Sequence, residues 1–68
     1  MRAREVIDGL PDLVRKQVEK YRFDYTHTES MHLQAEVRTR MAGYVLGLRD
    51  AGLITERGRQ IVFIYMTV

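Results

Sequence analysis

The chain has 68 residues and no cysteine, so disulfide bonds cannot stabilise it. A domain of this size buries only about 60% of the surface that its unfolded chain exposes, which makes its stability marginal. No group of cysteine and histidine residues indicates a structural metal either. We therefore expect a single domain over residues 1–68, stabilised by efficient packing or by association with another molecule.

The N-terminal segment MRAREVIDGLP is basic but lacks the apolar core of a signal peptide. No segment approaches the roughly 18 consecutive apolar residues of a membrane-spanning helix. These two features predict a soluble, cytoplasmic protein with no membrane partner.

Positive charge is concentrated in the second half of the chain. Residues 1–36 contain six Lys/Arg against seven Asp/Glu, whereas residues 37–68 contain five arginines against two acids. Arginine suits bidentate contacts with phosphate groups and with guanine. The distribution is compatible with a nucleic-acid partner, and equally with a solvated helix surface.

The spacing of apolar residues predicts two helices in the first part of the chain. A short helix is expected over Ala3–Asp8, and Gly9 is expected to end it in the left-handed conformation. A second helix is expected over Pro11–Tyr25, because its apolar residues recur at spacings of three and four and proline suits a first helical position.

A long third helix is expected to end near Ala51. Its alternative caps are Thr26 with Glu29, Thr28, or Ser30. The segment Met41–Leu48, MAGYVLGL, is apolar or small around its whole circumference, which is typical of a buried helix. Gly43 and Gly47 are spaced four residues apart and predict a groove for close packing.

The C-terminal segment predicts a β-hairpin. Gly52 is expected to stop the third helix, Leu53–Thr55 to begin a strand, and Gly58 to lie in the turn formed by ERGR. The return strand is expected over Gln60–Tyr65, with apolar side chains on both faces that require cover on both. The predicted fold class is therefore α+β and mostly helical.

The segment LRDAGLITERGRQIVFIY resembles the C-terminal half of winged helix-turn-helix DNA-binding domains, over about Met41 to Tyr65. In that family the recognition helix ends in a similar leucine, charged pair and Ala-Gly-Leu-Ile, and a hairpin called the wing follows. The resemblance implies a winged-helix-like arrangement. The residues that would hold the helix against the sheet are Leu48, Ala51, Gly52, Leu53 and Ile54.

The resemblance also implies a function, the binding of duplex DNA by a transcription regulator. Carried over residue by residue, it places Arg38, Thr39 and Arg40 at the base-reading start of the recognition helix. It places Arg57 and Arg59 at the tip of the wing, against phosphates or the minor groove.

No residue pattern indicates an enzyme. The sequence has no pairing of a nucleophile with a base, no glycine-rich phosphate loop after a strand and no isolated carboxylate pair. His32 and Glu36 share a helix face, but two such side chains without a third strong ligand indicate a surface pair rather than a metal site. We therefore expect no catalytic residue, no metal and no cofactor.

A second hypothesis fits the same elements equally well. It is a small non-enzymatic accessory protein, of the kind found in mobile elements and bacteria, that binds or inhibits another protein. Salt-dependent binding to duplex DNA distinguishes the two hypotheses, because contacts with phosphates weaken steeply as salt rises.

Both hypotheses suit a homodimer. The segments Met41–Leu48 and Ile61–Met66 are apolar on all sides, and one chain of this size is not expected to cover both. We expect contact between the central helices, with edge-to-edge pairing of the C-terminal strands as the alternative. The expected interface residues are Met41, Gly43, Tyr44, Gly47, Phe63 and Tyr65.

Overall fold

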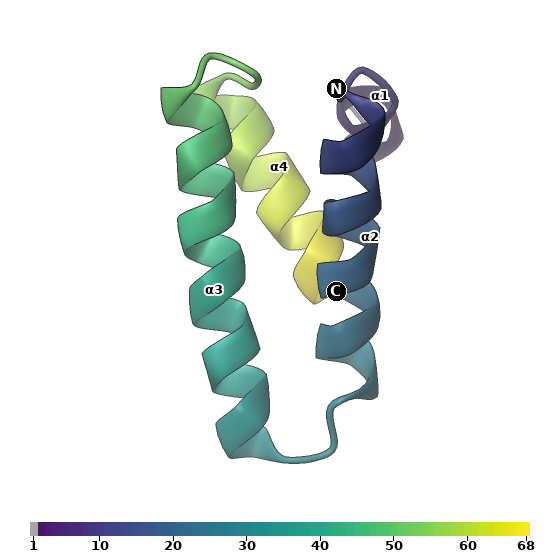
Figure 1. Ribbon diagram of the computed structural model, residues 1–68, viewed down its shortest axis with the longest axis vertical. Helices are drawn as coiled ribbons and strands as arrows, with labels where there is room; N and C mark the ends of the chain where they lie inside the picture. Colours follow the sequence, from purple (N-terminus) through teal and green to yellow (C-terminus); the bar gives the residue numbers. More distant parts are fainter. Residues whose placement is uncertain (1) are drawn as a thin grey trace.

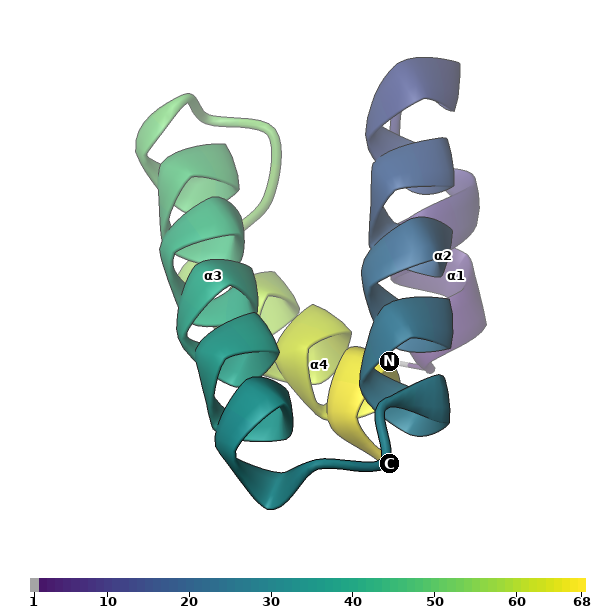
Figure 2. The same ribbon diagram turned by 60° about the horizontal axis from the view of Figure 1, so that its bottom comes forward.

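The fold consists of four α-helices. The computed structural model describes residues 2–68, and within that range it contains α1 (Ala3–Asp8), α2 (Asp12–His27), α3 (Met31–Asp50) and α4 (Glu56–Thr67) but no β-strand. Figure 1 shows α2 and α3 running in opposite directions, joined by a short loop. Figure 2 shows that α4 crosses between them on one side of the pair.

The first three helices lie close to their predicted positions. Pro11 precedes α2 as its N-cap, one position earlier than expected. Ser30 caps α3, because its hydroxyl accepts a hydrogen bond from the backbone N–H of Leu33 at 3.4 Å. The alternative cap at Thr26 is wrong, since this residue lies in the last turn of α2 and its hydroxyl donates to the carbonyl of Arg22.

The two predicted helix-ending glycines differ in conformation. Gly52 has φ +79°, and its N–H and that of Leu53 donate to the carbonyls of Arg49 and Leu48, the pattern of a Schellman motif. This prediction is confirmed. Gly9 also follows a helix, but its φ of −81° is one that any residue adopts, so the left-handed conformation predicted for it is wrong.

The predicted C-terminal hairpin is wrong, because residues 56–67 form α4. Thr55 begins this helix as its N-cap, and its hydroxyl accepts a hydrogen bond from the N–H of Gly58 at 3.0 Å. Glu56 in the first turn accepts from Arg59 and Gln60 of the following turn. These local contacts stabilise the start of a helix. The predicted winged-helix-like α+β fold is therefore wrong, and the described residues form an all-helical fold.

The apolar run of α4 is helical because tertiary packing outweighs its strand propensity. Gly58, Val62 and Met66 recur every four residues and are buried in a row on one side of the helix. A run that is apolar at both odd and even positions suits a covered strand, but it suits a helix with a wide apolar surface equally well. The contacts of α4 with all three other helices provide that cover.

The core lies where α4 meets the other helices. Its buried apolar residues are Ile7, Leu10, Val18, Met41, Val45, Leu48, Val62 and Met66. The prediction that the central segment of α3 is buried on all sides is wrong, because Gly43, Leu46 and Gly47 face outward and are exposed. No helix within residues 2–68 is long and apolar enough to cross a membrane.

Candidate functional site

The residues predicted to read DNA bases lie in the middle of α3 and point in different directions. The Arg38 guanidinium lies 5.8 Å from the centre of the Phe63 ring, on the side of α3 that faces α4. The Thr39 hydroxyl donates to the carbonyl of Ala35 at 3.1 Å. Arg40 instead borders a depression between α2 and α3. Residues two apart in a helix do not face the same way, so Arg38 and Arg40 do not form one surface.

The two arginines predicted for the wing tip lie in the first turn of α4. Arg59 donates through Nε to the Glu56 carboxylate at 2.9 and 3.1 Å, and Arg49 of α3 pairs with the same carboxylate. Hydrogen bonds from Arg59 and then from Arg49 hold the pKa of Glu56 far below its ordinary value. Arg57 is exposed and takes part in none of the ion pairs between the described residues. The two side chains therefore have different surroundings.

Three of the predicted dimer residues, all with bulky side chains, pack within the chain. Met41 is fully buried in the core. The Tyr44 ring lies 5.4 Å from the ring of Tyr21 in α2, and burial followed by the neighbouring Tyr21 raises the pKa of Tyr44. Phe63 is half-buried beneath Arg38. These side chains therefore pack against other residues of the same chain, and a second copy is not needed to cover them.

Tyr65, another predicted dimer residue, joins α4 to α2. Its hydroxyl donates to Glu19 at 2.6 Å, and this hydrogen bond, followed by burial, raises the pKa of Tyr65. The guanidinium groups of Arg22 and Arg4 lie 4.7 and 5.9 Å from the centre of its ring. Both distances suit cation–π contact.

The remaining predicted dimer residues, Gly43 and Gly47, lie on the outer side of α3. A Cβ atom added at either position would meet nothing within 4 Å. The close approach expected at these glycines is therefore not made by any described residue of this chain.

The outward side of α4 carries a second set of apolar side chains. We call Ile61, Ile64 and Val68 the α4 apolar strip, since their spacings of three and four residues place them on one side of the helix. Ile64 is 58% exposed and Val68 81% exposed. With Ala3, Arg22 and Tyr65 they line an open depression of about 300 Å³.

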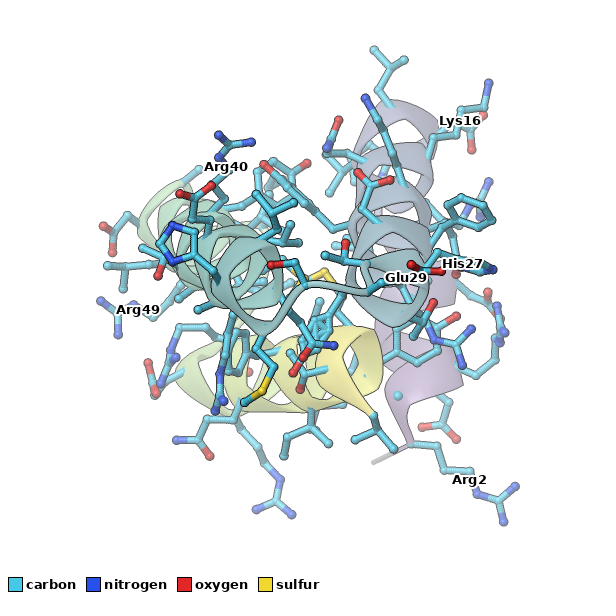
Figure 3. The ribbon with its side chains drawn as sticks, turned by 90° about the horizontal axis from the view of Figure 1, so that it is seen from below. Arg2, Lys16, His27, Glu29, Arg40 and Arg49 are labelled. Atoms are coloured by element: carbon cyan, nitrogen blue, oxygen red, sulfur yellow. The ribbon has the colours of Figure 1, made fainter. Side chains whose placement is uncertain are left out.

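A second depression of about 420 Å³ lies between α2 and α3, close to their connecting loop. Phe23 and His27 stack on one wall, with ring centres 3.9 Å apart. Arg40 and Glu36 line it from α3, so its charges are of both signs. His27 and His32 belong to different helices, and His32 pairs with Glu36 at 3.5 Å on the exposed surface. Figure 3 shows His27 and Arg40 on these two helices.

No protein-family model, curated protein or solved structure matches the chain. Of the two depressions, the one beside α4 has the more uniform chemistry, with four aliphatic side chains, one tyrosine and one arginine.

Proposed function

We propose that the chain is a non-enzymatic protein-binding module whose partner packs along the outward side of α4. The observation that carries this proposal is the α4 apolar strip beside an open depression. Fully burying an aliphatic side chain contributes on the order of 1.5–3 kcal/mol. Spacings of three and four residues suit packing against another helix. The partner would therefore gain most of its affinity from these side chains.

Selection from a library of helical peptides displayed on phage tests this proposal. We expect the selected peptides to bind Ile64→Gln at least about tenfold more weakly than the unmodified protein, because the substitution removes a central apolar contact. They should bind Leu13→Gln normally, since Leu13 is an exposed leucine of α2 that lies outside the strip. Selected peptides that bind both variants equally would contradict the proposal.

Binding of duplex DNA is the alternative function, but the hairpin wing expected to contact the DNA is absent, because residues 56–67 form α4. It would now depend on scattered arginines, of which Arg49 and Arg59 already share the Glu56 carboxylate. A gel-shift series with random duplex at low and moderate salt tests it. Binding that falls steeply with salt, and that weakens in Arg57→Gln but not in Ile64→Gln, would favour DNA over a protein partner.

We also propose that a second copy of the chain packs against the outer side of α3. Glycine inside a helix costs up to about 1 kcal/mol relative to alanine. Gly43 and Gly47 therefore destabilise α3. No described part of the chain packs closely against them, since a Cβ atom at either position would meet nothing within 4 Å. These glycines would allow a helix of the second copy to approach α3 closely.

A further inference from the structure

The α4 apolar strip is bordered by positive charge. Arg22 lines the depression, and it is the only charged residue among the described residues that do so. The Arg4 guanidinium lies 5.9 Å from the centre of the Tyr65 ring, and Tyr65 also lines the depression. Arg57 precedes Ile61 by four residues on the outward side of α4.

Arg22 and Arg4 stack on an aromatic ring and keep their charge available. Within residues 2–68 neither forms an ion pair, unlike Arg49 and Arg59. The neighbouring acid Glu19 accepts a hydrogen bond from the Tyr65 hydroxyl instead. A guanidinium held against a ring face still presents its N–H edge, and it loses less conformational entropy when it binds a carboxylate.

We infer that the partner is an acidic amphipathic helix. Its aliphatic side chains would pack on the α4 apolar strip, and its Asp or Glu side chains would pair with Arg22 and Arg57. Arginine–carboxylate pairs are frequently bidentate, which adds orientation to the attraction. This inference rests on the proposed function and specifies the chemistry of the partner at that same surface.

A second copy of the chain does not suit this surface. In a two-fold symmetric contact the same residues of both copies face each other, so the Arg22 side chains would approach with no acidic residue in the lining to offset them. Juxtaposed like charges oppose association and select against such a partner. The proposed contact between two copies accordingly lies elsewhere, on α3.

Binding of a labelled synthetic helix, followed by fluorescence anisotropy at low salt, tests the inference. The probe carries leucines at i, i+3, i+4 and i+7 with glutamates on both sides of that stripe. Matched probes carry glutamine or lysine in place of glutamate. We expect the glutamate probe to bind about tenfold more tightly than the glutamine probe, and the lysine probe to bind most weakly.

Protein variants locate the charge effect. In Arg22→Gln we expect the preference for glutamate over glutamine to fall to about threefold or less, and Arg57→Gln should reduce it through a second, exposed residue. Lys20→Gln makes the same change of charge on α2, outside the residues that line the depression, and should leave the preference intact. Ile64→Gln should weaken all three probes.

The outcomes separate the two proposals. Equal binding of the three probes, still weakened by Ile64→Gln, would overturn the acidic partner and leave the protein-binding function standing. If Ile64→Gln bound all three probes as tightly as the unmodified protein does, both the protein-binding function and the acidic partner would be overturned. Vesicles containing phosphatidylserine provide the remaining arm: binding to vesicles that depends on Ile64, with no binding to any probe, would assign the surface to an anionic membrane and overturn the inference.

Discussion

Glu56 is the side chain on which the most polar contacts of this small fold converge. Its carboxylate accepts hydrogen bonds from Arg59, Arg49 and Gln60, and so connects the start of α4 to the end of α3. The paired arginines hold the pKa of Glu56 far below its ordinary value of 4.5. In the unfolded chain these contacts are absent, so the unfolded state binds a proton more readily than the folded one.

The stability that Glu56 contributes should therefore be present above pH 4.5 and be lost as the pH falls below that value. We expect Glu56→Gln to lower the free energy of unfolding at neutral pH and to flatten its decline in acid. Urea denaturation followed by circular dichroism at a series of pH values measures both. Because the cluster is exposed, added salt should reduce the difference. Glu29→Gln is the control. If the free energy of unfolding of Glu56→Gln declined in acid as it does in the unmodified protein, the ion-pair cluster would be contradicted.

Gly52 is the residue where the backbone itself requires glycine. Its φ of +79° lies in the left-handed region, which costs other residues on the order of 1–2 kcal/mol. We expect Gly52→Val to lower the free energy of unfolding by about that amount. Gly9→Ala is the matched control, since Gly9 ends α1 at an ordinary φ of −81°. Equal midpoints in urea for the two variants would mean that α3 does not end in the left-handed turn.

At the scale of elements, α2 was predictable because its apolar residues recur with helical spacing, and α1 and α3 because glycine or serine marks their ends. The run Ile61–Tyr65 was not, because β-branched and aromatic residues favour strands. Its helical state depends on cover from three other helices. The overlooked signal was local, namely Thr55 followed by an acid in the first turn of α4.

The N-cap of α4 gives the corresponding prediction. Thr55→Ala removes the acceptor of the hydrogen bond from the Gly58 N–H and should cost about 1 kcal/mol of stability. Thr26→Ala is the control, since the Thr26 hydroxyl bonds to a carbonyl of its own helix and caps no helix start. Urea denaturation compares the two variants. A loss of stability no larger than in the control would argue against a helix beginning at Thr55.

At the scale of the whole molecule, the sequence did not reveal which surfaces stay uncovered. The α4 apolar strip could not be identified in advance, because the side of α4 that faces outward depends on how α1, α2 and α3 pack against the other side. The same packing removed the original reason for a dimer. Met41, Val45, Leu48, Val62 and Met66 are all buried within one chain. What remains for a second copy is the outer side of α3.

That surface allows folding and association to be separated in one variant. Leucine at positions 43 and 47 would meet no described atom near its Cβ and favours a helix more than glycine does, so Gly43→Leu with Gly47→Leu should raise the thermal midpoint of the monomer. The same side chains would hold two α3 helices apart. In sedimentation at micromolar concentration we expect the unmodified chain, of 8.0 kDa, to form a pair and the double variant to remain a monomer. Lys20→Leu, which adds an exposed leucine on α2, should pair normally. An unmodified chain that sediments as a stable monomer would overturn the homodimer.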